Sequence, residues 1–398
     1  MRLVVRGAEV TGASRLIDVT RAHVDSCLYH GEASLDFVRR LVEGHARVSI
    51  PTTLNVGAVD LLHPELYRGD PRRAERGRLL MDRYRSLGAR PTFTCAPYQL
   101  ADARPSFGEQ VAWGESNAIA FCNSVLGART NRYGDFLDIA CAITGRAPDA
   151  GLHRTDQRRA TVVLRLAADI PGTLRDADVL FPVLGIVLGR RAGSALAVID
   201  GLAPGQSEDR LKALGAAAAS SGSVAMFHVV GSTPEAATLD DALQHRSPVG
   251  EELIHLAELR AVRDELSTAT GERLGAVSLG TPHASLAELE RYAGMLGDGA
   301  VHPDVECLIS TGRDTLAQAP DVARRLRAAG VELLVDTCSY ITPILRRTDR
   351  PVMTDSGKWA YYAPGNIGAQ VVFGSSAECI RSAVAGRIVR NDTVWGGL

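Results

Sequence analysis

The chain has 398 residues, of which 45% are apolar and 23% are charged, a balance typical of a globular protein. Its 44 lysines and arginines against 46 aspartates and glutamates give a net charge of −2, so the composition does not favour binding to nucleic acid or to an anionic membrane. The length exceeds that of one ordinary hydrophobic core, and we therefore expect two domains.

The amino terminus and the cysteine usage predict a cellular compartment. Residues 1–7 are too few and too charged for a signal peptide, and no apolar run reaches the length of about 18 residues that crosses a membrane. We therefore expect a cytoplasmic protein. Because that compartment is reducing, the seven cysteines should be free thiols or metal ligands.

Buried strands that open into polar loops recur in the first third of the chain. After a short strand-like start, residues 21–33 form a loop rich in titratable side chains, and residues 34–43 show a helical pattern that Ser34 can cap. Residues 46–50 are typical of a buried strand that ends in a polar loop, and residues 90–98 repeat this arrangement. Loops of this kind are where α/β proteins keep their sites.

The rest of the chain alternates strand and helix. The expected strands are residues 162–166, 195–201, 224–231, 276–280, 306–313 and 332–340. This alternation predicts an α/β protein with a mostly parallel sheet. After the fourth of these strands, Ser285 and Glu288 have the spacing of a helix capping box, which puts His283 at the mouth of a helix N-terminus.

The densest group of hydrogen-bonding side chains lies within residues 112–135, among small apolar residues. Burying such groups is costly unless each has a partner, and a polar ligand is the simplest partner. Arg129 and Arg132 can project to one side of a helical turn, and their guanidinium groups match a carboxylate or phosphate. The sequence therefore predicts a small anionic ligand. The candidate residues are Glu115, Ser116, Asn117, Arg129 and Arg132.

The cysteines fall into classes by their position. Cys95 and Cys338 both end buried strands and are followed within a few residues by proline, a position that suits a metal ligand or a nucleophile. Cys27 lies in a polar loop, and Cys307 could be either structural or functional. The three cysteines in apolar helical segments are expected to act as small hydrophobes, and these are Cys122, Cys141 and Cys379.

Three further residues are candidates for proton transfer or charge stabilisation. Lys358, which follows Ser356 and Gly357, could clamp an anion or act as an acid or base, although a surface role is the alternative. A helix N-terminus disfavours protonation of His283, so this residue is a neutral base or a structural one. Burial would raise the pKa of Glu115 toward working pH, and a salt bridge to Arg129 is the alternative.

The order of these motifs resembles the aconitase X family, a group of iron-dependent hydro-lyases related to aconitase. The resemblance extends over residues 17–390. It implies a multi-domain, aconitase-like architecture of mostly parallel sheets flanked by helices. The matching segments are residues 23–29, 51–55, 94–98, 112–117, 123–132, 280–283, 336–338 and 356–362.

The resemblance also implies an iron centre, either an iron-sulfur cluster or a mononuclear iron, with Cys95 and Cys338 on two ligand positions. In the phosphomevalonate branch of the family the third ligand lies in a Gly-Cys-Pro-His motif, but this chain has Gly-Thr-Pro-His at residues 280–283. The third ligand is therefore expected to be Cys27 or Cys307.

Substrate contacts are implied by the same resemblance. The positions that match substrate contacts in the family are Ser26, Cys27, Asn55, Val56, Glu115, Ser116 and Lys358. To these binding positions the residue patterns add Asn117, Arg129, Arg132 and Ser356. The catalytic candidates are Glu115, Ser116, Lys358 and His283.

The family implies a smaller swivelling domain that closes over the site and carries a serine base. Residues 1–160 are expected to form a first domain with Cys95, and residues 161–398 a second part with Cys338 and Lys358. Neither segment is typical of the swivelling domain. A small partner subunit should therefore supply the base, or the base must come from this chain.

The predicted activity is that of a hydro-lyase acting on a small β-hydroxy carboxylate. By resemblance the substrate is cis-3-hydroxy-L-proline, which would give Δ1-pyrroline-2-carboxylate with iron as the Lewis acid. Two alternatives stay open. One is dehydration of another hydroxy acid, and the other is a non-catalytic subunit that binds a small anion.

Overall fold

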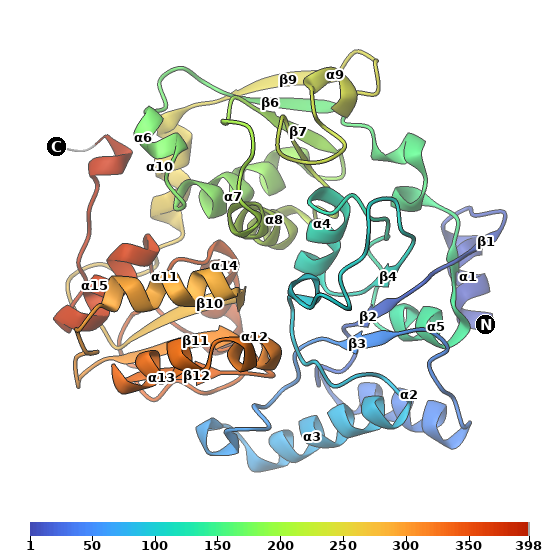
Figure 1. Ribbon diagram of the computed structural model, residues 1–398, viewed down its shortest axis with the longest axis horizontal. Coiled ribbons are helices and arrows are strands. Elements are labelled where there is room, and N and C mark those ends of the chain that lie inside the picture. The colour runs from blue at the N-terminus through green and yellow to red at the C-terminus, as the bar shows by residue number, and fades with distance from the viewer. Residues whose placement is uncertain (397–398) are drawn as a thin grey trace.

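The computed structural model describes residues 1–396, and Gly397 and Leu398, the last two residues of the expected second part, lie outside the described residues. Figure 1 shows three groups of elements that follow one another along the chain. The first, in blue and cyan, lies beside the second, in green and yellow, and the third, in orange and red, completes the molecule. Each group contains a sheet in which all strand pairs are parallel.

The first sheet has three short strands in the order β3-β2-β4. A separate antiparallel pair joins β1 to β5. The strands are β1 (Leu16–Asp18), β2 (Ala22–Val24), β3 (Thr52–Leu54), β4 (Ala112–Trp113) and β5 (Arg146–Pro148). The helices are α1 (Arg2–Val10), α2 (Glu32–Glu43), α3 (Pro71–Ser86), α4 (Ser116–Ser124) and α5 (Leu137–Thr144).

The second sheet has four strands in the order β8-β7-β6-β9. Its helices α7 and α8 pack closely because Gly185 of α7 lies against the backbone of α8, where a Cβ atom would come within 2.3 Å of the Leu214 carbonyl oxygen. The strands are β6 (Val162–Leu166), β7 (Ala197–Asp200), β8 (His228–Val229) and β9 (Gly250–Ile254). The helices are α6 (Gly172–Arg175), α7 (Leu180–Ala192), α8 (Glu208–Gly222), α9 (Leu239–Ala242) and α10 (Leu256–Glu265).

The third sheet has five strands in the order β12-β11-β10-β13-β14. The strands are β10 (Ala276–Ala284), β11 (Glu306–Thr311), β12 (Val331–Leu334), β13 (Val352–Thr354) and β14 (Val371–Phe373). The helices are α11 (Leu286–Leu296), α12 (Arg313–Gln318), α13 (Pro320–Ala328), α14 (Gly357–Ile367) and α15 (Ser376–Ala385).

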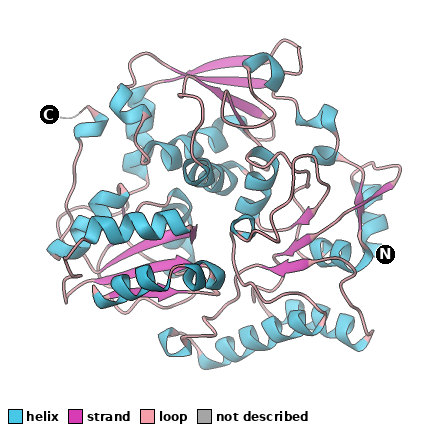
Figure 2. Cartoon of the chain, viewed as in Figure 1, coloured by secondary structure: helices cyan, strands magenta, loops and turns pink. Residues whose placement is uncertain are grey.

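Both faces of this third sheet are buried, as expected for parallel strands. Figure 2 shows helices on its two sides. Successive side chains of a strand point to opposite faces. Val277 and Ile309 pack against α11, α13 and α15, whereas Ala276 and Leu308 join the core of α7, α8 and α14. The prediction of mostly parallel sheets flanked by helices is thereby confirmed.

Local predictions in the first third of the chain need correction. The strand-like start is α1, an amphipathic helix that buries Val4 and Ala8, one turn apart. Helix α2 begins at Glu32, with Gly31 and not Ser34 at its N-cap. Residues 46–50 form no strand, since their backbone N–H groups bond to Leu41 of α2, to Leu87 directly after α3 and to Ala142 of α5 instead of to a neighbouring strand.

Residues 90–98 also form no regular strand. Phe93 has a positive φ of 41°, which interrupts an extended ladder. The segment still follows β3, since Arg90 and Thr94 donate backbone hydrogen bonds to Thr52 and Leu54. The capping box of Ser285 and Glu288 is present as predicted. Within residues 1–396, none of the helices combines the length and the apolar character that crossing a membrane requires.

Candidate active site

Loops at the carboxyl ends of two parallel sheets meet around one cavity. Parallel strands bring the residues that follow them to one edge of the sheet, where α/β proteins bind ligands. From the first sheet come Asp25 after β2, Asn55 after β3 and Glu115 after β4. From the third sheet comes Lys358 after β13, and Tyr340 follows β12.

This cavity has a volume of about 200 Å³. It gathers six of the residues singled out by the sequence, namely Asn55, Val56, Cys95, Glu115, Ser116 and Lys358. Sequence reasoning gave no role to Asp25, Tyr340, Tyr362 and Asn366, which also line it. The position of Asp25 directly after a strand of the parallel sheet is the signal that could have identified it.

Cys95 and Cys338 lie together in the fold, although they are far apart along the chain. Potential ligand atoms of Cys95, His283 and Cys338 all lie within 4.8 Å of one another, and all three residues are buried. Burial raises the pKa of Cys95, but the adjacent Cys338 side chain and His283 bring that pKa down to about 6. The neighbouring Cys95 side chain and burial raise the pKa of Cys338.

His283 is held by protein groups through both ring nitrogens. Nδ1 lies 3.0 Å from Oγ1 of Thr94, and Nε2 lies 3.2 Å from the carbonyl oxygen of Thr337. Its backbone N–H donates to Sγ of Cys95 at 3.3 Å. Coordination of a metal by this imidazole would replace one of the two ring hydrogen bonds. Oγ1 of Thr281 is also buried and has no hydrogen-bond partner within residues 1–396.

These donors fit a transition metal. Two sulfurs and an imidazole are ligands that iron and zinc accept, and a low pKa keeps one thiol in the form that binds metal. The expected third ligands are not in this group. Cys27 donates to the carbonyl oxygen of Asn55 at 3.0 Å, and Cys307 lies on the opposite face of the third sheet, against α11 and α13. Among the described residues, His283 is the third residue of this group.

The second feature of the cavity is a buried ion pair. Nζ of Lys358 lies 2.7 Å from Oε1 of Glu115, and both side chains are 5% exposed. Burial raises the pKa of Glu115, but the Lys358 ammonium outweighs it and the pKa is lowered. Burial lowers the pKa of Lys358, and Glu115 more than offsets this, so that pKa lies above its usual range. The expected upward shift for Glu115 is therefore wrong, and its partner is Lys358, not Arg129.

Both members of the pair stand at the start of a helix. Glu115 is the N-cap of α4 and accepts a hydrogen bond from the backbone of Ala118. Ser356 is the N-cap of α14, accepts from the backbone of Trp359 at 3.1 Å and donates to the carbonyl oxygen of Thr281. The structure thus gives Ser356 a clear positioning contact, since it ties the start of the Lys358 helix to the strand that carries His283.

Three predicted residues near the cavity make contacts within the protein. Ser116 lies beside Glu115, with Oγ 3.2 Å from Oε1. Asn117 is buried and donates to the carbonyl oxygen of Cys95 at 2.7 Å. Ser26 is buried and donates to Oδ1 of Asp138 at 2.8 Å. Of the three, only Ser116 lines the cavity.

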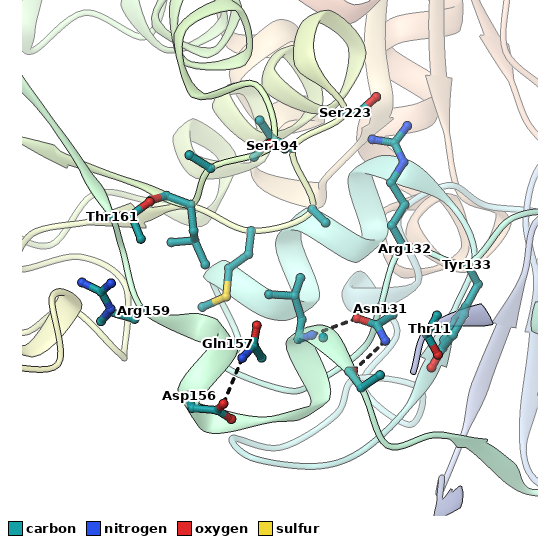
Figure 3. A pocket seen from close by; sticks show the side chains of 18 of the residues that line it. Thr11, Asn131, Arg132, Tyr133, Asp156, Gln157, Arg159, Thr161, Ser194 and Ser223 are labelled. Atoms are coloured by element: carbon teal, nitrogen blue, oxygen red, sulfur yellow. Dashed lines mark hydrogen bonds between the residues drawn. The ribbon is translucent and has the colours of Figure 1, made fainter. Parts of the chain in front are cut away.

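The expected arginine clamp is not formed at this cavity. Arg129 donates to the carbonyl oxygen of His153 at 3.2 Å. Arg132 lines a second, larger cavity of about 1100 Å³ between the first and second groups of elements. Figure 3 shows the Arg132 side chain at that cavity, which neither Lys358 nor Cys95 lines. The two arginines separate because the backbone after α4 is irregular and does not continue as a helical turn.

A network of contacts fixes the Cys338 loop against the first sheet. Asp336 has a positive φ of 63° and is fully buried, and both its carboxylate oxygens accept from Arg313. Its carbonyl oxygen accepts from the backbone of Gly57 at 2.7 Å. In return, Oδ2 of Asp60 accepts from the backbone of Val335 at 3.0 Å. The two sheet edges are therefore bonded to each other directly beside the cavity.

Comparison with known proteins gives results along the whole chain. Models of three successive aconitase X domains match it, the first at residues 1–156, the second at 160–264 and the third at 274–385. A cis-3-hydroxy-L-proline dehydratase of Pseudomonas aeruginosa is 42% identical, over 99% of this chain and 68% of the relative. One from Hypocrea jecorina is also 42% identical, over 97% of this chain and 65% of the relative.

More distant relatives match over nearly their full length. The phosphomevalonate dehydratase large subunit of Methanosarcina mazei is 33% identical, over 97% of this chain and 92% of that subunit. The crystal structure of Thermococcus kodakaraensis aconitase X in its holo-form superposes with a TM-score of 0.84 at 31% identity, covering 96% of this chain and 94% of that one. The chain thus spans about two thirds of the first two relatives and most of the others.

Proposed function

The chain belongs to the aconitase X family, and we propose that it is a hydro-lyase that converts cis-3-hydroxy-L-proline to Δ1-pyrroline-2-carboxylate. The two 42% identical relatives carry the name of that dehydratase. The observation that carries the proposal is that one cavity is lined by the Glu115–Lys358 pair and by Cys95, which lies beside Cys338 and His283.

Each step of a dehydration needs a different chemical group at the cavity. The C–O bond at the β-carbon breaks, a proton leaves the α-carbon, and water departs, after which the enamine product rearranges to the imine. Hydroxide is a poor leaving group, and an iron ion held by Cys95 and Cys338, with His283 beside them, would supply the Lewis acid that this step needs.

Lys358 is suited to hold the substrate carboxylate. Negative charge spreads onto that carboxylate as the α-proton leaves, and a buried ammonium aimed at developing charge stabilises it far more than water does. Glu115 keeps Lys358 charged and oriented, and Ser116 offers a hydroxyl beside them. The cavity supports these roles without Arg129 and Arg132, which line no part of it.

The α-proton needs a base, and this chain offers Glu115 or a group from a partner. Its ion pair with Lys358 makes Glu115 a weak base. The proposed enzyme therefore also contains a small swivelling unit, on this polypeptide or on a separate subunit. A serine of that unit acts as the base that removes the α-proton. The name "large subunit" of the Methanosarcina relative supports a separate one. Residues 1–160 and 161–398 would form the two walls that it covers. A cytoplasmic location suits the seven free cysteines, all of them buried.

The test is anaerobic purification from the native host, followed by an iron assay and turnover of cis-3-hydroxy-L-proline. We expect Cys95→Ser to lose iron and at least 100-fold in activity. Cys379→Ser is the matched control, because Cys379 is buried in α15 on the far face of the third sheet. Full activity and iron in Cys95→Ser would contradict the proposal.

Two other functions would give different results in the same experiment. A dehydratase of another hydroxy acid would contain iron and turn over a different member of a substrate panel that includes phosphomevalonate. A non-catalytic subunit would stay free of iron after anaerobic reconstitution and turn over none of them.

A further inference from the structure

Asn55 has an unused acceptor inside the active-site cavity. The residue is 3% exposed and lines the cavity, and its side-chain Nδ2 donates to Oδ1 of Asp25. Oδ1 of Asn55 is buried and finds no hydrogen-bond partner within residues 1–396. Leaving a buried acceptor unpaired is costly, so this atom indicates a donor that arrives with a ligand.

Asp25 lies next to that acceptor, in surroundings that favour a cation. Its backbone N–H donates to Oδ2 of Asp138 at 2.7 Å, and its side chain lines the cavity. Burial, followed by the nearby carboxylates of Glu115 and Asp135, raises the pKa of Asp25 to about 8. A positive charge placed beside this carboxyl group would relieve both the repulsion and the cost of burial.

The charges around the cavity do not suit a phosphorylated substrate. Lys358 is the one Lys or Arg among the residues that line it, and Glu115 offsets its charge at 2.7 Å. Phosphate sites in proteins use arginine forks or several donors. A further acidic side chain, that of Asp25, lines the cavity beside Asn55.

We propose that Asp25 and Asn55 form a subsite for the protonated amine of the substrate. A secondary ammonium, as in the ring of a 3-hydroxyproline, carries two N–H donors. A bound ammonium favours ionisation of Asp25, whose carboxylate then accepts one N–H, and Oδ1 of Asn55 accepts the other, while Lys358 takes the substrate carboxylate. The subsite thus selects hydroxy acids that carry an ammonium group over those that do not. This inference rests on the proposed function, because the substrate proposed there carries such a group.

The test compares two ligands that differ only at the amine. L-proline and cyclopentanecarboxylate have the same ring size and the same carboxylate, and neither has a hydroxyl group to lose. Calorimetric titration of the iron-loaded wild-type protein at pH 7 should show that L-proline binds about 10- to 100-fold more tightly, the range expected for hydrogen bonds to a charged group. Asp25→Asn should abolish that preference and leave the affinity for cyclopentanecarboxylate unchanged.

Asp135→Asn is the matched control. It removes the same charge from a neighbouring carboxyl group that is exposed and does not line the cavity, so it should keep most of the preference for L-proline. Equal binding of the two ligands by the wild-type protein overturns the proposal, and so does an Asp25→Asn protein with an intact preference. The first comparison needs no variant and holds even where Asp25→Asn does not fold.

Failure of the subsite and failure of the proposed reaction are distinguishable. A protein that prefers L-proline but does not turn over cis-3-hydroxy-L-proline has the amine subsite without the proposed reaction. A protein that turns over hydroxyproline but binds both ligands equally has the reaction without the subsite.

Discussion

The ammonium of Lys358 lies 2.7 Å from the carboxylate of Glu115, although the two residues are 243 positions apart in the chain. Each stands at the start of a helix, one beside the first sheet and the other beside the third. Because both are buried, the pair joins the two walls of the cavity and also sets its charge. An attractive contact that bridges two walls should matter for stability as well as for activity.

We expect Lys358→Met to destabilise the protein by about 3–5 kcal/mol, since it leaves Glu115 as an unpaired buried carboxylate. Chemical denaturation measures this loss. The double variant Glu115→Gln with Lys358→Met should be more stable than Lys358→Met alone, because it removes both charges. Together with Glu115→Gln alone, these variants form a double-mutant cycle. If the losses of stability in the two single variants add up to the loss in the double variant, the two side chains do not interact. Lys358→Met should also lose at least 100-fold in activity.

The contribution of Asp25 to the stability of the protein should fall as pH rises through the range in which its buried carboxyl group stays protonated. Its pKa is about 8 in the folded state against 3.8 for the unfolded group. Between these values the unfolded chain loses a proton that the folded chain keeps, so the free energy of unfolding decreases with pH. The contribution is present below about pH 4 and lost by about pH 8, on the order of 5 kcal/mol in all.

Asp25→Asn removes this titration and isolates it from the rest of the protein. In denaturation between pH 5 and pH 8, in steps of roughly one unit, the stability of the wild type should fall relative to that of this variant. At pH 8 the variant should be the more stable of the two. Parallel curves for the wild type and Asp25→Asn would contradict the assignment, and Asp135→Asn reports the effect of a nearby exposed charge.

The loop that carries Cys338 should depend on Arg313. Its guanidinium binds both oxygens of Asp336, which is fully buried. Arg313→Leu would leave that carboxylate unpaired, so we expect a loss of about 3 kcal/mol in stability and weaker iron retention. Arg324→Leu is the control, because the Arg324–Asp321 pair is highly exposed and contributes little. Iron retention equal to that of the wild type would show that the loop is held by its other contacts.

Arg132 lies outside the candidate active site, and its removal should leave the reaction intact. It lines the larger cavity of Figure 3 and is exposed. We expect Arg132→Ala to keep kcat and KM for cis-3-hydroxy-L-proline within about twofold of the wild type, since surface substitutions away from special contacts change little. A rise of tenfold or more in KM would show that Arg132 contributes to substrate binding.

Local patterns in the sequence determined the class of fold and several candidates for the site. Alternation of strand and helix predicted the parallel sheets, and the spacing of Ser285 and Glu288 predicted the cap of α11. Cys95 and Cys338 stood out because the sequence placed them at the ends of expected buried strands, and Lys358 because it follows Ser356 and Gly357. These inferences depend only on neighbours within a few positions.

Only the tertiary structure decided which of these groups meet. It paired Glu115 with Lys358 instead of Arg129, placed His283 beside the two cysteines, and brought Asp25 into the cavity. The direction of the Glu115 pKa shift followed from that pairing, because burial raises this pKa, whereas Lys358 and the backbone hydrogen bonds together lower it by more. Such contacts join residues hundreds of positions apart, and the periodicity of a sequence carries no information about them.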